Sequence, residues 1–363
     1  MPLSGRRHLR TSLAGLLLAL SLVWLAALMR SRPSPEEPGA SAVPTAIGQG
    51  WYRLYFTDPG GLKAVRLRGG PDAALAEAID QSQYSVDVAA YDLDLWSIRD
   101  ALIDAHRRGV EVRVVTEADN LGHREFADLA AARIPVIGDN QPSLMHHKFV
   151  VIDRLEVWTG SMNLTLGSAY WGNNNLLALQ SGDLAYSYTR EFEEMFLENR
   201  FGAVSRADTP IPRVVFGGAE VQVLFSPDDG VLQQLLALVG SAERSIEFLA
   251  FAFTSTDLAQ AMTDRADHGV QVRGVFDQEQ AGGQGSVYPL MREAGIDVRL
   301  DSLSGDMHHK VILIDRAIVV TGSYNFSRSA EEQNDENLLI LHSPQVADQY
   351  LIEFDRIFRQ ALR

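Results

Sequence analysis

The sequence of 363 residues contains no cysteine, which excludes disulfide bridges, thiolate nucleophiles and cysteine zinc sites. It is also short of positive charge, because 32 Lys and Arg stand against 47 Asp and Glu and give a net charge of −15. Such a surface repels polyanions at long range, which disfavours a broad nucleic-acid groove but leaves a small site for one phosphate open. The hydrophobic share of 46% and the charged share of 22% exclude a largely disordered or multi-span membrane protein.

Acidic residues are absent from residues 1–32, where an apolar run from Leu13 to Met29 is flanked by five arginines. The run is long for a signal-peptide core and short for a membrane span, and no clear cleavage site follows it. We interpret residues 1–32 as a signal peptide or an N-terminal membrane anchor, which predicts a membrane-anchored or secreted, extracytoplasmic protein. The Pro/Ser/Ala-rich residues 33–49 are predicted to form a flexible linker. Without the five arginines, the remaining chain carries a charge of −20.

The rest of the chain contains an internal repeat. Residues 84–91 are similar to residues 244–251 at an offset of 160, and a Met-His-His-Lys sequence recurs at an offset of 162. We therefore predict a tandem duplication, with the first half over residues 50–205 and the second over residues 215–363.

Apolar strand-like runs alternate with amphipathic helical segments in both halves, which predicts an α/β fold with helices covering the sheets. The expected helices are 72–82, 96–107, 230–241 and 257–267, and the expected strands are 84–91, 110–116, 149–152, 245–253, 270–276 and 311–314.

Each half also carries one set of polar residues at identical spacing, His-x-Lys-x4-Asp-x6-Gly-Ser-x-Asn. The residues are His146, Lys148, Asp153, Ser161 and Asn163 in the first half, and His308, Lys310, Asp315, Ser323 and Asn325 in the second. Positions i and i+2 of a strand face the same side, so the histidine and lysine of each motif are expected to point together. The intervening His147 and His309 are expected to point away and to be structural.

This paired motif resembles that of the phospholipase D superfamily, over about residues 50–363. Residues 321–330 and 334–337 also resemble the subgroup of compact bacterial nucleases and mitochondrial cardiolipin hydrolases. The resemblance implies two similar halves packed about a pseudo-twofold axis with one shared active site and a covalent phosphohistidine intermediate, without metal or cofactor. It also implies that His146 is the nucleophile, and that His308 is the general acid and then the base for the attacking water.

The residue types fit phosphodiester cleavage, because a neutral imidazole can attack phosphorus while an imidazolium protonates the departing alkoxide. Donors suit the non-bridging oxygens, where negative charge concentrates in the transition state. The expected donors are Lys148, Lys310, Asn163 and Asn325, with the hydroxyls of Ser161 and Ser323 as further candidates. The resemblance places Asp153 and Asp315 outside the phosphate site, as local structural acceptors.

A further carboxylate orients each histidine in the family. Glu336 matches this position 28 residues after His308, whereas the equivalent residue of the first half, 28 after His146, is Asn174. We expect Glu336 to lie beside His308 and raise its pKa, and Asn174 to orient a neutral His146. This hypothesis predicts that Glu336→Gln shifts the pH–rate profile and slows departure of the leaving group.

Several functions stay open. We favour a phospholipid phosphodiesterase acting at a membrane surface, because the body is acidic and an anchor precedes it. A nuclease of the same superfamily is the main alternative, although the acidic charge disfavours nucleic acid. A phosphatidyltransferase similar to cardiolipin synthases ranks below both, and a membrane-tethered binding protein with a dead site is disfavoured because both motifs are intact. Both motifs lie in one chain, which predicts a monomer.

Overall fold

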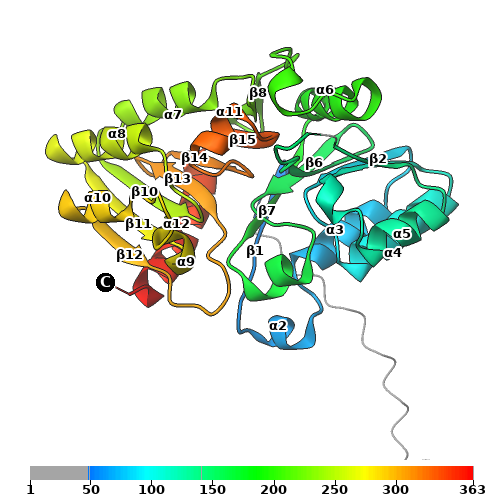
Figure 1. Ribbon diagram of the computed structural model, residues 1–363, viewed down its shortest axis with the longest axis horizontal. Helices are drawn as coiled ribbons and strands as arrows, with labels where there is room; N and C mark the ends of the chain where they lie inside the picture. Colours follow the sequence, from blue (N-terminus) through cyan, green and yellow to red (C-terminus); the bar gives the residue numbers. More distant parts are fainter. Residues whose placement is uncertain (1–47, 49, 140, 363) are drawn as a thin grey trace, which may run out of the picture. The chain divides into compact units, whose positions relative to one another are not determined.

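The computed structural model describes residues 48, 50–139 and 141–362 (Figure 1). The predicted signal or anchor, residues 1–32, lies outside the described residues, and so does the predicted linker 33–49 except for Gly48. In the part of the chain that is described, no helix is long and apolar enough to cross a membrane.

The first half forms a sheet with the strand order β1-β7-β6-β5-β2-β3-β4. Its strands are β1 (Tyr52–Phe56), β2 (Ser85–Ala90), β3 (Glu111–Thr116), β4 (Val136–Gly138), β5 (Lys148–Ile152), β6 (Glu156–Gly160) and β7 (Asn175–Gln180). Its helices are α2 (Leu62–Arg66), α3 (Pro71–Asp80), α4 (Trp96–Arg107), α5 (Arg124–Ala131) and α6 (Gly182–Glu198), with short turns of helix η1 (Ala118–Asn120), η2 (Gly167–Trp171) and η3 (Gly202–Val204).

The second half repeats this plan in a sheet ordered β12-β11-β10-β13-β14-β15-β9-β8. Its strands are β8 (Arg213–Phe216), β9 (Ala219–Ser226), β10 (Ser245–Ala250), β11 (Gln271–Phe276), β12 (Asp297–Leu300), β13 (Lys310–Ile314), β14 (Ile318–Gly322) and β15 (Glu336–His342). Its helices are α7 (Val231–Gly240), α8 (Thr256–Asp267), α9 (Gln278–Ala281), α10 (Tyr288–Glu293), α11 (Arg328–Glu332) and α12 (Pro344–Gln360).

The predicted α/β class is confirmed, and each expected helix and strand has an observed counterpart. The parallel pairs β2–β3 and β10–β11 are joined through α4 and α8, as parallel strands require a crossover connection. Within each pair an ion pair lies at equivalent positions of the repeat: Arg113 with Asp87 at 2.7 Å, and Arg273 with Glu247 at 3.0 Å. The predicted strand 245–253 is shorter than expected and ends at Ala250.

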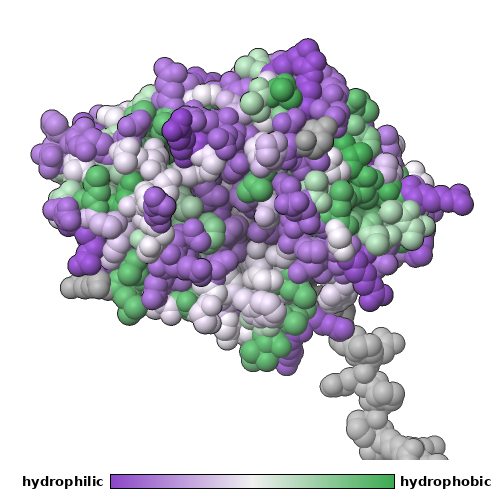
Figure 2. All heavy atoms as spheres, in the orientation of Figure 1, coloured by the Kyte–Doolittle hydropathy of each residue, from purple (hydrophilic) through white to green (hydrophobic). Residues whose placement is uncertain are grey.

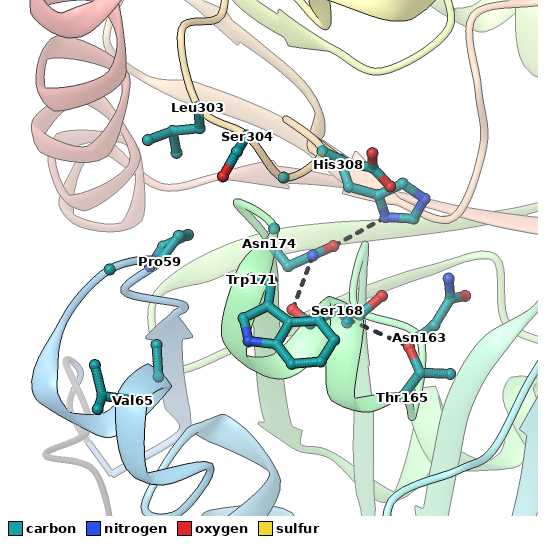
Figure 3. Close-up of a pocket in the computed structure, with 16 residues that line it drawn as sticks. Pro59, Val65, Asn163, Thr165, Ser168, Trp171, Asn174, Leu303, Ser304 and His308 are labelled. Carbon is teal, nitrogen blue, oxygen red and sulfur yellow. Dashed lines mark hydrogen bonds between the residues drawn. The ribbon is translucent and has the colours of Figure 1, made fainter.

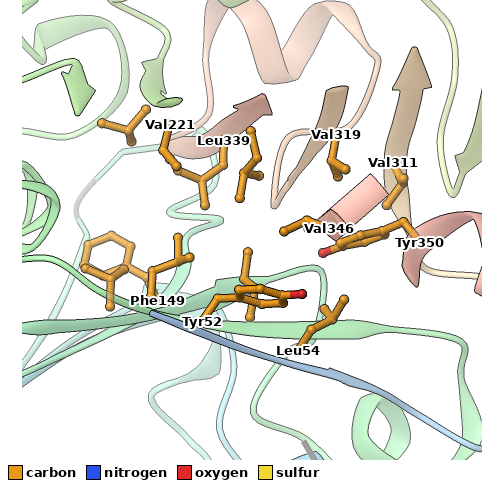
Figure 4. Packing of buried hydrophobic residues seen from close by; sticks show 14 of the residues in the cluster. Tyr52, Leu54, Phe149, Val221, Val311, Val319, Leu339, Val346 and Tyr350 are labelled. Atoms are coloured by element: carbon orange, nitrogen blue, oxygen red, sulfur yellow. The ribbon is translucent and has the colours of Figure 1, made fainter. Parts of the chain in front are cut away.

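A hydrophobic core is shared by the two halves (Figure 4). Tyr52, Leu54 and Phe149 of the first half pack in one cluster with Val346 and Tyr350 of α12. Each half also has its own cluster on the other side of its sheet, which α3 and α4 cover in the first half and α7 and α8 in the second. The sheets therefore face each other across a common core, and the motif residues at the ends of β5 and β13 meet beside it.

Candidate active site

Both motif histidines lie immediately before a central strand, His146 before β5 and His308 before β13. Their backbones are held by the opposite half, because His146 N donates to Asp335 O and His308 N donates to Asn173 O, each at 2.9 Å. Bridges between Met145 and Asp335, and between Asn173 and Met307, form the same crossed pattern. Each histidine is therefore fixed at the contact between the halves.

The imidazole partners are crossed in the same way. Nδ1 of His146 lies 2.7 Å from Oε2 of Glu336, and Nδ1 of His308 lies 2.9 Å from Oδ1 of Asn174. The prediction that Glu336 serves His308 and Asn174 serves His146 is therefore wrong. The reason is the pair of bridges, which bring Asp335 and Asn173 to the other half, so that the next residue in each case reaches the other half's histidine.

The hydrogen bonds also fix which nitrogen of His308 carries a proton. Nδ1 of His308 faces both Asn174 Oδ1 and the carbonyl oxygen of Ser161, at 2.9 and 3.0 Å. The orientation of the Asn174 amide follows from its other contacts, because its Nδ2 donates to Ser168 O and its Oδ1 accepts from the Ser161 hydroxyl. Nδ1 of His308 must therefore be the donor, which leaves Nε2 with its lone pair. The Glu336 carboxylate assigns the same tautomer to His146.

The motif lysines are buried next to the histidines. Lys148 Nζ donates to the carbonyl oxygen of His146 at 2.7 Å, and Lys310 Nζ donates to that of His308 at 2.8 Å. Each ammonium group also lies over an aromatic ring, Tyr91 at 5.2 Å and Phe251 at 4.7 Å. The sequence prediction omitted these two rings, although they end the repeated segments 84–91 and 244–251.

Burial dominates the electrostatics of the site. It lowers the pKa of Lys148 to about 7 and the pKa of Lys310 well below its ordinary value. Burial also holds the pKa of both motif histidines well below the usual range, and the two lysines act in the same direction. The pKa of Glu336 is raised by burial to about 7, against the attraction of Lys148. The site thus holds two buried lysines whose ammonium forms are disfavoured by burial, although nearby carboxyl groups attract them. An added anion would stabilise both ammonium groups.

The motif serines contact the residues that orient the histidines. The Ser161 hydroxyl donates to Asn174 Oδ1 at 2.9 Å, and Ser323 accepts from the backbone N–H of Asn337 at 2.9 Å and interacts with Glu336. These hydroxyls bind the residues that orient the histidines, and their donation to substrate stays a prediction. The oxygens of the Asn163 and Asn325 side chains are buried without a hydrogen-bond partner, so these amides are not committed elsewhere in the fold.

The motif aspartates bind backbone away from the histidines. Asp153 accepts from the N–H groups of residues 83–85 at 2.6–3.1 Å, and Asp315 accepts from those of residues 243–245 at 2.6–2.9 Å. Both therefore join the hairpin turn after the motif strand to the start of the neighbouring strand, β2 or β10.

His147 points to the other side and contacts Glu191 at 3.0 Å, as His309 contacts Glu353 at 3.5 Å.

A cavity of about 760 Å³ opens onto one of the two histidines (Figure 3). Polar side chains of Asn163, Asn174 and His308 line one part of it, and apolar groups of Val65 and Trp171 line another. The loop 303–306 of the second half closes against Trp171 and Gly172, where a Cβ on Gly305 would lie 2.0 Å from the Trp171 carbonyl oxygen. The sequence prediction did not include the loop 303–306.

This chain belongs to the phospholipase D-like family. Residues 75–196 and 235–358 each match the family described as "Cardiolipin synthase, PLD-like domain", and together they make up more than half of the chain. The family resemblance stated from the paired motif is thereby confirmed, and the family is one of phosphodiester-cleaving enzymes.

Among named relatives, the chain is similar to the mitochondrial cardiolipin hydrolase of Chlamydomonas reinhardtii, with 28% identity over 45% of this chain and 83% of the relative. The human protein of that name is 37% identical over 36% of this chain and 52% of the relative. A phospholipase D of Rickettsia bellii is 31% identical over 37% of this chain and 66% of the relative. The chain thus spans about half the length of the human relative.

Two solved structures are also similar. The phosphatidylserine synthase of Haemophilus influenzae matches 85% of this chain and 86% of its own, with 13% identity and a TM-score of 0.62, which shows the same two-half fold. Nuc of Salmonella typhimurium, a phospholipase D family member, is 33% identical over 39% of this chain and 96% of its own, with a TM-score of 0.37.

Proposed function

We propose that this chain hydrolyses the head-group ester of a phospholipid through a covalent phosphohistidine, acting at a membrane on its extracytoplasmic side. The observation that carries the proposal is the pair of buried motif lysines beside two imidazoles of fixed tautomer. Burial lowers the pKa of Lys148 and Lys310 although carboxyl groups such as Glu336 attract both, and a bound phosphodiester monoanion would stabilise their ammonium forms.

The two histidines differ in a way that divides the chemistry between them. Attack by Nε2 of His146 on phosphorus makes its ring positive, and the Glu336 carboxylate at Nδ1 stabilises that charge. His308 has only neutral acceptors at Nδ1, Asn174 Oδ1 and the Ser161 carbonyl oxygen, so its protonated form is a stronger acid. We therefore assign His146 as nucleophile and His308 as general acid.

The proposed reaction has two steps. The first starts from His308 protonated at Nε2 as well as at Nδ1: the His146 Nε2–phosphorus bond forms, the bond from phosphorus to the head-group oxygen breaks, and His308 gives its Nε2 proton to that oxygen. In the second, His308 takes a proton from water, the water oxygen bonds to phosphorus and the N–P bond breaks. The products are the head-group alcohol and phosphatidic acid. Lys148, Lys310 and the amides of Asn163 and Asn325 donate to the non-bridging oxygens.

Lipid is preferred over nucleic acid as substrate for two reasons. The chain carries a net charge of −15, which repels a polyanion but permits one phosphate group in a cavity. The cavity has an apolar wall, with Val65, Trp171 and Leu303, beside the polar groups of Asn163 and His308. Since the two motifs complete one site, a single chain is proposed to be active.

The test incubates the purified full chain in detergent with mixed phospholipids, single-stranded DNA and RNA, without added metal, beside its His146→Ala form. Release of phosphatidic acid by the parent and not by the variant supports the proposal. Cleaved nucleic acid with untouched lipid would establish a nuclease instead. Formation of a phosphatidyl ester with an added alcohol, without phosphatidic acid, would establish a transferase, and no turnover of any substrate would favour a binding protein.

A further inference from the structure

The connection between β1 and α3 is longer than the repeat requires. Fourteen residues, 57–70, join β1 to α3 in the first half, whereas four residues, 227–230, join the equivalent β9 to α7 in the second. The extra length contains α2, which packs on η2 through its one buried residue, Ala64. The insertion is therefore not needed to build the sheet.

The insertion leaves two large apolar side chains in solvent. Leu62 is 76% exposed and Val65 is 77% exposed, and Trp171 of the adjacent η2 is 54% exposed. Hydrophobic side chains accordingly gather at the surface over α2 (Figure 2). Exposed apolar groups that lie together, rather than singly, mark an interaction surface.

The charge around these side chains is opposite to that of the whole chain. Lys63, Arg66 and Arg68 are exposed in the insertion, against one acidic residue, Asp58. The chain as a whole has a net charge of −15. A basic rim around exposed apolar groups complements anionic head groups above acyl chains.

The same insertion reaches the catalytic cavity. Ala64 and Val65 line that cavity together with His308 and Asn163, so α2 forms part of its wall. A second cavity of about 340 Å³, lined in part by Leu62, Lys63 and Tyr170, lies on the other side of α2. The exposed surface of α2 therefore lies beside the catalytic cavity.

We propose that residues 57–70, through Leu62, Val65 and the rim of Lys63, Arg66 and Arg68, dock on an anionic phospholipid bilayer and bring the cavity against it. The proposal rests on the proposed lipid substrate. It differs from an N-terminal anchor, because it sets the orientation of the active site and not only its concentration at the membrane. A phospholipid then passes from the bilayer to His308 along the wall formed by Val65 and Trp171.

The absence of cysteine allows a direct test on the full chain. Leu62→Cys labelled with an environment-sensitive fluorophore is mixed with vesicles of phosphatidylcholine, with and without phosphatidylglycerol. Val215→Cys on β8, 77% exposed and outside both cavities, is the matched control. The expected result is a blue shift at position 62, larger with phosphatidylglycerol, and none at position 215. No shift at position 62, or a shift with single-stranded DNA in place of vesicles, would overturn the docking surface.

A second variant measures the consequence for turnover. Leu62→Asp is expected to lower hydrolysis of phospholipid in vesicles by roughly tenfold, because an apolar side chain no longer enters the bilayer, and to leave hydrolysis of a dissolved short-chain phospholipid unchanged. Val215→Asp is expected to change neither rate. Equal vesicle rates for Leu62→Asp and the parent would contradict the proposal. A blue shift at position 62 without phosphatidic acid release would instead refute the proposed function while supporting the docking surface.

Discussion

Glu336→Gln is the substitution that tests the division of roles most sharply. Glu336 is fully buried and lies 2.7 Å from His146 Nδ1, so the variant keeps the volume of the side chain and removes its charge. The glutamine can present its oxygen to His146 Nδ1, as the carboxylate does. The tautomer of His146 is then retained, and the loss is the charge itself.

The expected loss follows from the strength of such bonds. A hydrogen bond to a charged group contributes roughly 1.5–3 kcal/mol and one between neutral groups roughly 0.5–1.5 kcal/mol. The positive charge on His146 in the transition state is therefore stabilised less by about 1–2 kcal/mol, which lowers kcat by roughly 5- to 30-fold.

The pH dependence gives the sign of the effect. The pKa of Glu336 is raised to about 7, so the carboxylate is present above that pH and is lost as the pH falls through it. The gap in kcat between parent and variant is expected to be widest above pH 7 and to close below it. The assay measures kcat from pH 5 to 9, and Glu353→Gln serves as control because this buried glutamate contacts the non-motif His309. A Glu336→Gln profile that matches the parent at every pH would refute the reasoning.

Three further substitutions have defined outcomes. Asn174→Asp places a carboxylate at His308 Nδ1, which raises the pKa of that histidine and weakens it as an acid. Hydrolysis of an alkyl diester, whose leaving group needs the proton, is expected to slow more than hydrolysis of a nitrophenyl diester. Equal slowing of the two substrates would contradict this. Lys310→Met removes a buried ammonium group. We expect kcat to fall by at least about 100-fold, while the Tm measured without substrate does not fall. A lower Tm would show that the charge stabilises the fold. Asp315→Asn keeps one acceptor oxygen for the three backbone N–H groups and replaces the other by an NH2 group that cannot accept, so it is expected to cost about 1–3 kcal/mol of unfolding free energy in urea. Burial acts to raise the pKa of Asp315, but those N–H groups lower it below the ordinary value. The difference in unfolding free energy between parent and variant is therefore present at neutral pH and disappears as the pH falls through that lowered pKa. A difference that grows in acid would refute the assignment.

The internal repeat made much of the fold predictable. Apolar runs such as 84–91 and 245–253 form strands at the centre of a sheet, where both faces are buried. Apolar and polar residues alternate little in such strands, so the short length of the run is what indicates a strand and not a helix. The long helices α6 and α12 were not predicted, although α6 carries Leu184, Tyr188 and Phe192 at helical spacing. These helices pack in the shared core, so the spacing of their apolar residues could have been used to predict them.

The partners of the histidines were not predictable in the same way. Spacing within a half locates Glu336 and Asn174 relative to the motifs but carries no information about which half each residue touches. That choice is made by the bridges Met145–Asp335 and Asn173–Met307, which exist only once the halves pack together. The insertion 57–70 has no counterpart in the second half, so the repeat did not indicate the cavity wall it builds.

The covalent intermediate is the central claim of this account and can be trapped. The full chain is mixed with phospholipid, quenched within the first turnover at alkaline pH, where phosphohistidines survive, and digested for mass spectrometry. The predicted result is a phosphatidyl group on His146 of the parent chain that is absent from His146→Ala. Phospholipid turnover with the adduct on His308, or with no adduct on either histidine, would contradict it.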